Sequence, residues 1–321
     1  MSILRALRRE GVLGINRRNV DYTLRWNPRR FYPIVDDKLT TKERCQGAGI
    51  PVPALLAVAR HHFEIPRLLR ELANLDSFVL KPSHGAMGNG ILVVGRRDGA
   101  RFQRAGGRWI TANDLRYHAA SIISGLYALG GQIDAAFVEE RILVHPALDD
   151  VATDGLPDLR VIVFRGVPVM SMTRLPTQRS AGRANLHQGA VGAGVDLSDG
   201  RLTHAIQENR PVSKHPDTEH PLIGHVVPYF ERALEIAVAA TDLTGLGYVG
   251  ADVVVDATRG PLILELNARP GLAIQLANRA GLLPRLCAVE ERWQPGLSLA
   301  ARIALGREIA QTALTAQESQ G

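Results

Sequence analysis

The stretch GYVGADVVVDATRGPLILELNARPG, residues 247–271, predicts the centre of the fold. Two runs rich in β-branched and aliphatic residues, 248–256 and 261–266, flank the four residues 257–260. Gly260 can take the positive φ that a tight turn needs, so the pattern predicts a β-hairpin. Folding the hairpin symmetrically about this loop pairs Asp256 with Pro261, Val254 with Ile263, and Asp252 with Glu265.

The open end of the predicted hairpin gathers oxygen atoms. Opposed residues of an antiparallel pair hold their Cβ atoms roughly 5 Å apart, so the carboxylates of Asp252 and Glu265 meet, and Asn267 shares their face. Two like charges this close are costly unless a cation lies between them, and oxygen ligands favour Mg²⁺ or Mn²⁺. The alternative is a polar hairpin mouth with one protonated carboxylate. We expect the other face to be core: Val253, Val255, Leu262, Leu264 and Leu266.

Composition indicates an ordinary globular protein. The chain has 321 residues, of which 45% are hydrophobic and 22% charged. A chain of this length can bury enough core for two lobes. No apolar run is long enough to span a membrane, and residues 1–11 lack the apolar core of a secretory signal. Cys45 and Cys287 form no metal or redox spacing. These features predict a cytoplasmic protein.

The net charge of +6 is concentrated near the N-terminus, where only Glu10 and Asp21 offset eight arginines within the first 30 residues. Such a segment can contact an acidic substrate, nucleic acid or an anionic membrane surface. Without aromatic interleaving or a recognition motif, a solvated arm docked by apolar side chains is favoured. The arginines are Arg5, Arg8, Arg9, Arg17, Arg18, Arg25, Arg29 and Arg30, and the docking side chains are Ile3, Leu4, Leu7, Val12 and Leu13.

Hydrophobic periodicity and turn residues predict the remaining elements. The predicted helices are 36–49, 66–74, 114–129, 221–243, 271–283 and 297–315. The predicted strands are 77–81, 91–94, 136–142, 159–164 and 167–173. The glycine- and arginine-rich segment 178–200 has no hydrophobic period, so we predict a functional loop there.

Three further groups of residues could bind an anionic substrate. The stretch KPSHGAMGNG, residues 81–90, puts a lysine before a glycine-rich turn whose N–H groups could approach phosphate oxygens; a plain glycine-rich hairpin is the alternative. It is neither a Walker A loop nor a Rossmann fingerprint. Glu139, Glu140 and Ile142 end a strand that could contact adenine and ribose, or face solvent. Four arginines could together bind phosphates or a carboxylate, although each alone is typical of a surface: Arg160, Arg174, Arg183 and Arg269.

Taken in order, these motifs form a recognisable set. A helix led by Asp37-Lys38 is followed by LKPSHG, VEERI, DLR, RANLHQGA and finally the hairpin with LELNARPG. The set resembles the ATP-grasp superfamily, and most closely its α-L-glutamate ligases, typified by the ligase that modifies ribosomal protein S6. The resemblance runs from about Asp36 to about Leu283. It implies an α/β (α+β) fold, the ATP-grasp fold, in which two α+β lobes grip ATP.

The resemblance also implies a domain division. Residues 1–35 would be an arginine-rich arm in place of the family's usual N-terminal domain, so that the N-terminal region is truncated. Residues 36–143 would form the N-lobe, 144–287 the C-lobe and 288–321 a helical extension. The loop between Ile142 and Asp158 is longer than the family's spacing.

Roles follow for the residues that match the motifs. Two lysines, Lys38 and Lys81, would hold the ATP phosphates. A flexible loop over residues 83–90, which includes Ser83, Gly85 and Gly88, would close over the phosphates. A hinge formed by Glu139, Glu140 and Ile142 would contact adenine. Asp158 would bind ribose, and Arg183 and Asn185 would lie on the phosphate side. Asp252, Glu265 and Asn267 match the magnesium triad, which would hold two Mg²⁺ or Mn²⁺ ions.

The implied activity is ligation of a carboxylate to an amine. The carboxylate would attack the γ-phosphate of ATP, and an amine, such as the α-amino group of glutamate or another amino acid, would attack the resulting acyl-phosphate. Lys81 and Arg183 would neutralise charge, and the carboxylate would be held by Arg160, Arg174 and Arg269. The acceptor would be a peptide, a protein C-terminus or a small acid, and no nucleic acid is expected.

Two other functions fit the same motifs. One is an ATP-grasp phosphotransferase. The other is a nucleotide-binding regulatory module without ligase activity, which docks on a membrane or a protein through the arginine-rich arm. The short N-terminal region also suggests an apolar surface that a second subunit of a homo-oligomer would cover.

Overall fold

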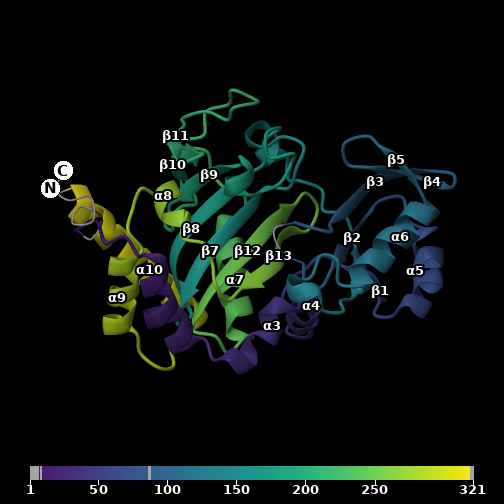
Figure 1. Ribbon diagram of the computed structural model, residues 1–321. Helices are drawn as coiled ribbons and strands as arrows, with labels where there is room; N and C mark the ends of the chain where they lie inside the picture. The colour runs from purple at the N-terminus through teal and green to yellow at the C-terminus, as the bar shows by residue number, and fades with distance from the viewer. Residues whose placement is uncertain (1–6, 8, 86–87, 319–321) are drawn as a thin grey trace. The chain divides into compact units, whose positions relative to one another are not determined.

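The computed structural model describes residue 7 and residues 9–85 and 88–318 (Figure 1). Its chain divides into two compact units. Unit 1 contains Met1–Val35, Arg44–Pro51 and Val144–Gly321, and unit 2 contains Asp36–Glu43 and Val52–Leu143. Some residues of the predicted arm and glycine loop lie outside the described residues: Ile3, Leu4, Arg5, Arg8, Ala86 and Met87.

Unit 2 is built on an antiparallel six-stranded sheet in the order β1-β6-β2-β3-β4-β5. Its strands are β1 (Leu55–Ala59), β2 (Phe78–Pro82), β3 (Leu92–Asp98), β4 (Arg101–Arg104), β5 (Trp109–Thr111) and β6 (Ala136–Glu139). Its helices are α4 (Lys38–Gly47, which continues into unit 1), η3 (His62–Glu64), α5 (Ile65–Leu72), α6 (Ala112–Ile123) and η4 (Leu129–Gly131). The apolar stripes of α5 and α6 pack against the sheet around Leu68, Phe78 and Leu115, which forms the core of this unit.

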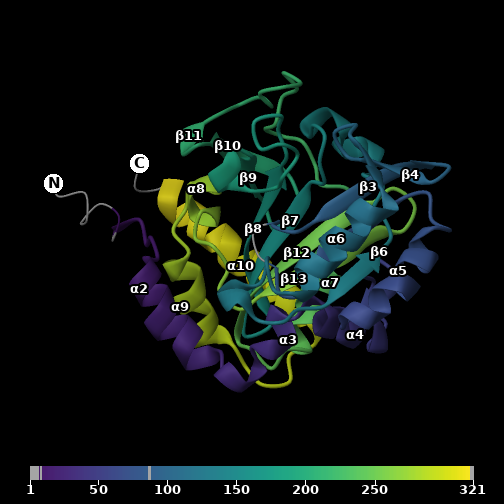
Figure 2. The same ribbon diagram turned by 45° about the vertical axis from the view of Figure 1, so that its right-hand side comes forward.

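Unit 1 is built on an antiparallel seven-stranded sheet in the order β11-β10-β9-β8-β7-β12-β13 (Figure 2). Its strands are β7 (Asp158–Phe164), β8 (Val167–Leu175), β9 (Val191–Val195), β10 (Leu202–Gln207), β11 (Arg210–Pro211), β12 (Tyr248–Asp256) and β13 (Gly260–Asn267). Every residue of β12 is buried. This strand carries Asp252, so a fully buried carboxylate lies within the sheet.

The helices of unit 1 cover this sheet. They are α2 (Ile15–Arg17), the π-helix η1 (Arg18–Leu24), η2 (Arg29–Phe31), α3 (Pro33–Asp36), η5 (Pro146–Val151), η6 (Leu186–Gln188), α7 (Phe230–Asp242), α8 (Ile274–Ala277), α9 (Leu283–Arg292) and α10 (Leu299–Glu318). Helix α7 contacts β12 and β13, and α10 contacts β8. The central apolar cluster includes Phe164, Tyr248 and Leu286.

The described part of the N-terminal segment is an integral part of unit 1. Leu13 and Tyr22 are buried in the central cluster, and the side chain of Asn27 bonds β12 and the residue that follows β13. Asn27 Nδ2 donates to the carbonyls of Tyr248 at 2.7 Å and of Ala268 at 2.9 Å. Leu13, one of the side chains expected to dock this segment, is thus buried in unit 1.

The predicted hairpin is confirmed, but its register differs near the turn. The two strands are β12 and β13, and Gly260 has a φ of +72°. Asp256 pairs with Gly260 and Val254 with Leu262, one residue away from the predicted pairs. A bulge at Leu264 restores the register, so that Asp252 pairs with Glu265 as predicted.

Asp256 explains the shift. Its Oδ1 accepts the N–H groups of Thr258 at 2.9 Å and Arg259 at 3.0 Å, which closes a tight turn over residues 257–259. Gly260 then becomes the first residue of the return strand instead of the last residue of the loop.

Other predicted elements are wrong in extent. The segment 178–200 is not loop throughout, because Val191–Val195 forms β9. Its sequence VGAGV has no hydrophobic period, yet the glycines are required: a Cβ on Gly194 would lie 2.6 Å from the carbonyl oxygen of Ala277. The sequence analysis also misses β1, β4, β5, β10, β11 and α9.

Three predicted helices are shorter than expected. Helix α7 begins at Phe230 because Tyr229 has a φ of +53°, a left-handed conformation that cannot continue a right-handed α-helix. Helix α6 ends at Ile123, two residues before Gly125, whose φ is +81°. Within the predicted helix 271–283, only Ile274–Ala277 and Leu283, the first residue of α9, are α-helical.

None of the described helices combines the length and the apolar character that crossing a bilayer requires.

Candidate functional site

Unit 1 carries a row of charged side chains across neighbouring strands. Arg160 of β7 lies opposite Asp252 of β12, which lies opposite Glu265 of β13. Two residues before Arg160, Asp158 lies opposite Arg174 of β8. Because side chains two apart on a strand share a face, all five point to the same side of the sheet.

Hydrogen bonds at short distances join the row. Arg160 binds Asp252 with both Nε and Nη2, at 2.7 and 2.6 Å. Arg174 binds Asp158 in the same bidentate way, at 2.6 Å for each bond, and its Nη2 also donates to Asp252 Oδ2 at 2.7 Å. Asp252 is therefore held by two guanidinium groups and Asp158 by one.

This unequal sharing moves the pKa values of the two carboxyl groups in opposite directions. Burial alone would raise the pKa of Asp252, but Arg160 and Arg174 outweigh it and hold that pKa far below its usual range. Burial raises the pKa of Asp158 to about 6, since only Arg174 opposes it closely and the charge on Asp252 adds to it. Burial also acts on Arg174, but the two carboxylates outweigh it and raise the pKa of the guanidinium.

The predicted metal ligands meet at the open end of the hairpin. Asn267 Nδ2 lies 3.3 Å from Glu265 Oε1 and 3.4 Å from Asp252 Oδ2. Rotating the amide of Asn267 by half a turn would present its oxygen to the same point. Two carboxylates and one amide oxygen are the donors that Mg²⁺ accepts, with water and phosphate oxygens completing its shell. The residues present therefore fit the ion.

The three side chains are not a complete cage. No group of three or more His, Cys, Asp or Glu side chains within residues 9–85 and 88–318 is placed to hold a metal ion. A site of two carboxylates and an amide depends on a substrate that brings further oxygen atoms, as a nucleotide does.

The other predicted residues of unit 1 are outside the charged row. Arg183 is exposed, and its Nη1 lies 3.4 Å from Gln188 Oε1 in the same loop. Asn185 accepts the N–H of His187 at 3.0 Å and so caps η6. Arg269 is exposed, with its guanidinium carbon 5.3 Å from the ring centre of Tyr32.

Unit 2 contains a buried cluster of two lysines and one carboxylate. Lys81 on β2 contacts Glu139 on β6, and Lys42 on α4 lies 3.0 Å from the other oxygen of the same carboxylate. All three side chains are buried. Burial lowers the pKa of Lys42, with Glu139 opposing that effect and Lys81 adding to it.

Lys42 escapes the sequence reasoning, which selects Lys38 from the same helix. Lys38 instead donates to the carbonyl of Gly85 at 2.5 Å, in the glycine-rich loop. One signal could have identified Lys42: it lies one helical turn after Lys38 in DDKLTTK, on the same side of the helix.

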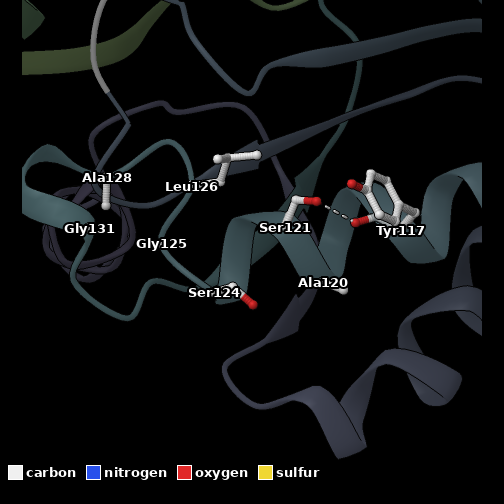
Figure 3. A pocket seen from close by; sticks show the side chains of 8 residues that line it. All are labelled: Tyr117, Ala120, Ser121, Ser124, Gly125, Leu126, Ala128 and Gly131. Carbon is white, nitrogen blue, oxygen red and sulfur yellow. Dashed lines mark hydrogen bonds between the residues drawn. The ribbon is translucent and has the colours of Figure 1, made fainter.

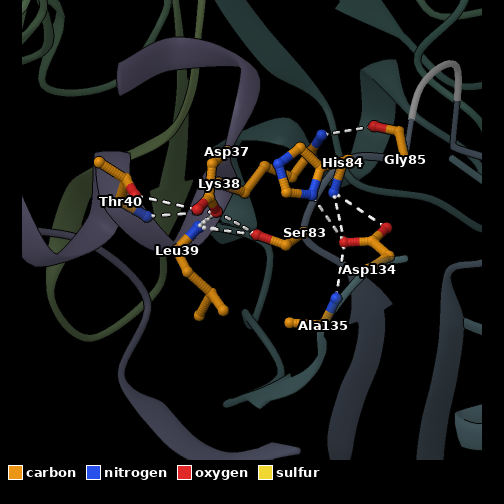
Figure 4. A network of polar contacts seen from close by, with 9 residues as sticks. All are labelled: Asp37, Lys38, Leu39, Thr40, Ser83, His84, Gly85, Asp134 and Ala135. Carbon is orange, nitrogen blue, oxygen red and sulfur yellow. Dashed lines mark hydrogen bonds and ion pairs between the residues drawn. The ribbon is translucent and has the colours of Figure 1, made fainter. Parts of the chain in front are cut away.

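The start of the glycine-rich loop is anchored on both sides (Figure 4). On one side, the buried Ser83 contacts Asp37, whose Oδ1 also accepts the N–H of Leu39 at 2.9 Å and so caps α4. On the other side, His84 bonds Asp134 through its backbone N–H at 3.1 Å and through its ring Nδ1 at 2.8 Å. Asp134 is missed by the sequence analysis, which contains no signal for it.

The hydrogen bonds at Asp37 also set its protonation. Burial raises the pKa of this carboxyl group, but the hydrogen bonds from Ser83, Thr40 and Leu39 outweigh burial and lower it. Asp37 is thus an ionised N-cap at the start of α4.

The remaining residues that were predicted to bind the nucleotide in unit 2 are Glu140, Ile142, Gly85 and Gly88. Glu140 accepts the backbone N–H of Ala54 at 2.6 Å, so its carboxylate joins two segments of this unit. Ile142 is buried. Any larger residue at position 85 would displace its neighbours, because a Cβ on Gly85 would lie 2.3 Å from the side chain of Pro82. Gly88 has a φ of +75° and open space around it.

Comparisons with known proteins identify similar chains. The model of the family described as "Sugar-transfer associated ATP-grasp" matches residues 17–291. A "Probable alpha-L-glutamate ligase" of Pasteurella multocida (strain Pm70) is 26% identical over 236 residues, which are 74% of this chain and 54% of that protein. A protein of the same description from Enterobacter sp. (strain 638) is 42% identical over 50 residues, 16% of each chain. The chain thus spans about half the length of the first of these curated relatives.

Solved structures of other ATP-grasp proteins are more distant. The ATP-grasp ligase PsnB complexed with minimal precursor has a TM-score of 0.44 and 17% identity, over 86% of this chain and 64% of that one. The D-alanine–D-alanine ligase of Bacillus anthracis complexed with ATP has a TM-score of 0.40 and 13% identity, over 91% of this chain and 70% of that one.

Proposed function

Because the chain belongs to the sugar-transfer-associated ATP-grasp family, whose model matches residues 17–291, we propose that it is an ATP- and Mg²⁺-dependent carboxylate–amine ligase. The observation that carries the proposal is the convergence of Asp252, Glu265 and Asn267 beside two partly buried arginines. This group combines oxygen ligands for a divalent ion with guanidinium groups for an anionic substrate.

The residues of unit 2 are proposed to bind the nucleotide. Lys81 and Lys42 share the single carboxylate of Glu139, so the buried cluster carries a net positive charge. A polyphosphate would offset that charge, and the N–H groups of residues 83–90 would add hydrogen bonds. Lys38 would join them by exchanging the carbonyl of Gly85 for a phosphate oxygen. Glu139, Glu140 and Ile142 would contact adenine. Asp158, which belongs to unit 1, would contact the ribose.

Asp252, Glu265 and Asn267 would hold Mg²⁺ or Mn²⁺. A bound ion would supply positive charge to the β- and γ-phosphate oxygens, which neutralises the charge that develops in phosphoryl transfer. Arg160 shares Asp252 with this site, and its bidentate contact keeps the buried carboxylate ionised and ready to accept an ion.

Two arginines are proposed to position the acceptor carboxylate. The hydrogen bonds of Arg160 and Arg174 use Nε and Nη2 of each guanidinium, and neither Nη1 has a hydrogen-bond partner among the described residues. Both side chains are fixed by their carboxylate partners, so each Nη1 is a pre-oriented donor. Arg269 would provide a third, more mobile donor from the surface.

The reaction would proceed in two steps. A carboxylate oxygen of the acceptor attacks the γ-phosphorus of ATP, and the bond to the bridging oxygen breaks to give an acyl-phosphate and ADP. The nitrogen of an amine then attacks the acyl carbon, and phosphate leaves with the electron pair of the broken C–O bond. Lys81 and Arg183 would stabilise the phosphate charge, and the Nη1 groups would stabilise the tetrahedral oxyanion.

The names of the relatives suggest which substrates to test. The curated relatives are described as probable α-L-glutamate ligases, so glutamate is the first amine to examine. The family description associates its members with sugar transfer, so sugar acids belong among the carboxylates, beside peptides and small acids.

The experiment is phosphate release from Mg-ATP across a matrix of amino acids and carboxylates. The wild type is compared with Glu265→Gln and with Glu291→Gln, which removes the same charge from an exposed position on α9. We expect release that depends on one amine–carboxylate pair, falls at least about 100-fold in Glu265→Gln and is unchanged in Glu291→Gln.

Two results would contradict the proposal. Release that needs a carboxylate but no amine, with a stable phosphorylated product, would indicate a phosphotransferase. Tight ATP binding without turnover for any pair would indicate a regulatory module.

A further inference from the structure

The turn between β7 and β8 contains an arginine in a strained backbone conformation. Arg165 and Gly166 join the two strands, and Arg165 has a φ of +50°. Its backbone is fixed there, because its N–H donates to the carbonyl of Gly247 at 2.7 Å and its own carbonyl accepts the indole N–H of Trp293 at 2.8 Å. Glycine or asparagine would take this conformation at lower cost, so an arginine in this place favours a role for its side chain.

Two tryptophans hold the guanidinium group of Arg165. Its central carbon lies 3.8 Å from the ring centre of Trp293 and 4.6 Å from that of Trp26. Contact with the face of an indole ring attracts and orients a guanidinium group without using its N–H groups. The N–H groups of Arg165 thus stay available as oriented donors.

The charge of Arg165 is not matched by a nearby carboxylate. Glu290 acts on it electrostatically, but the carboxylate of Glu290 binds Arg25 at 3.3 Å. Burial lowers the pKa of Arg165, and the opposing effect of Glu290 does not offset it. Among the residues that the structure describes, Arg165 has no ion-pair partner, and it is a half-buried cation.

Arg165 lines a hollow of about 450 Å³ in unit 1. Two other charged residues line it, Arg302 and Asp242, and they neutralise each other through two hydrogen bonds of 2.7 Å. The lining therefore carries one net positive charge, which belongs to Arg165. The large apolar side chains of the walls are Trp26, Leu246, Trp293 and Leu297.

A second hollow shows why the cation matters. The hollow of about 570 Å³ at the end of α6, in unit 2, has no charged side chain in its lining (Figure 3). Nothing in that lining selects one class of ligand. The hollow at Arg165 does, because a half-buried guanidinium beside apolar walls favours an anion with an apolar body.

We propose that the hollow at Arg165 binds a small monocarboxylate with an apolar body, through two parallel hydrogen bonds from the guanidinium group. The two oxygens of a carboxylate match the fork of guanidinium N–H groups. The single charge of the ligand equals that of the lining, whereas a phosphate dianion would leave a negative charge near Asp242.

This site is separate from the charged row and does not depend on the ligase activity. Arg165 lies five residues after Arg160, which is about 16 Å of extended strand. A carboxylate bound at Arg165 is thus out of reach of the row.

The test is calorimetric titration of the full-length protein with benzoate and with benzamide, which have nearly the same shape and differ in charge. The proteins are the wild type, Arg165→Gln and the matched control Arg96→Gln. Arg96 also contacts a tryptophan, Trp109 at 5.5 Å, but belongs to unit 2 and does not line the hollow. We expect benzoate to bind at least about tenfold more tightly than benzamide in the wild type and in Arg96→Gln, and no such preference in Arg165→Gln.

A second variant and a second measurement guard against misfolding. Arg165→Asn removes the guanidinium group and suits a positive φ, so we expect a folded protein that also lacks the preference for benzoate. In NMR spectra of the wild type, benzoate should shift the indole N–H signals of Trp26 and Trp293 and leave that of Trp109 in place.

Three results overturn the proposal. The first is benzoate binding no more tightly than benzamide in the wild type. The second is a preference for benzoate that survives in Arg165→Gln and Arg165→Asn, or disappears in Arg96→Gln, which would place the carboxylate elsewhere. The third is phenyl phosphate binding more tightly than benzoate, which would make the ligand a phosphate.

Discussion

At the scale of single residues, the charged row of unit 1 shows how two neighbouring buried carboxyl groups come to have pKa values shifted in opposite directions. Asp252 receives three hydrogen bonds from two arginines, whereas Asp158 receives two from one. The difference follows from strand register, because Arg160 lies directly opposite Asp252 and Arg174 directly opposite Asp158. The carboxylate proposed to hold a metal ion is the better compensated of the two.

The raised pKa of Asp158 predicts a specific dependence of stability on pH. Its pKa is about 6 in the folded protein against 3.8 for the ordinary group, so the folded chain binds more protons between these values. The stability that this group contributes is therefore complete below about pH 4 and is lost as the pH rises through 6.

The prediction is measured as the difference in the free energy of unfolding between the wild type and Asp158→Asn. Urea unfolding at pH 4, 5, 6 and 7 can be followed by the fluorescence of Trp26 and Trp293, both in unit 1. We expect the difference to fall, by on the order of 1 kcal/mol or more, from pH 4 to 7. A difference that grows with pH would mean that Arg174 outweighs burial.

The residues of the proposed site differ in how far the sequence could predict them. Asp252, Glu265 and Asn267 were predictable because hairpin pairing and alternation follow from local sequence. The partners of the arginines were not, since pairing between β7, β8 and β12 joins residues up to 92 positions apart. Lys42 was missed because its contact with Glu139 depends on how α4 packs on the sheet.

At the scale of elements, the hairpin and its bulge explain why a wrong register at the turn did not affect the site. The tight turn at Asp256 shifts the first pairs by one residue, and the extra residue Leu264 reverses that shift before Glu265. A symmetric hairpin and a bulged one thus predict the same pairing at the open end. The bulge is not predictable from alternation alone, because Leu262, Ile263 and Leu264 are three apolar residues in succession.

A second element, the loop that carries Arg183, depends on close backbone contact. Gly182 has a φ of +73°, and a Cβ on it would lie 2.3 Å from the carbonyl oxygen of Asp154. Gly182→Ala would force this loop away from the loop 143–157 and move Arg183. We expect a loss of stability of about 2 kcal/mol or more and a larger fractional loss of phosphate release.

Gly296→Ala is the matched control for this prediction. Gly296 has a φ of +81° with no atom within 4 Å of an added Cβ, so the substitution carries the same backbone strain without the clash. It should cost about 1 kcal/mol and leave phosphate release unchanged. Equal effects of the two substitutions on phosphate release would show that the contact with Asp154 does not position Arg183.

At the scale of the whole molecule, the fold class and the order of the motifs were predictable. The way in which the N-terminal segment packs into unit 1 was less predictable. The composition of residues 1–35 predicts a solvated, arginine-rich arm that is docked by apolar side chains, Leu13 among them. The structure packs the described part of this segment into unit 1 through Leu13, Tyr22 and Asn27. Arg18 itself is buried and donates to the carbonyl of Pro270 at 2.8 Å, a contact that charge counting does not predict.

We propose that Asp252, Glu265 and Asn267 link the binding of a divalent ion to the binding of ATP. It requires no knowledge of the acceptor, because it concerns the nucleotide alone. The most direct measurement is calorimetric titration with a non-hydrolysable ATP analogue, with Mg²⁺ and with a chelator, on the wild type, Glu265→Gln and Glu291→Gln.

We expect Mg²⁺ to strengthen binding of the analogue at least about tenfold in the wild type and in Glu291→Gln, but not in Glu265→Gln. Binding in the chelator should be the same for all three proteins, since the lysines of unit 2 are unchanged. If Mg²⁺ strengthens binding of the analogue as much in Glu265→Gln as in the wild type, then Glu265 is not a ligand of the ion.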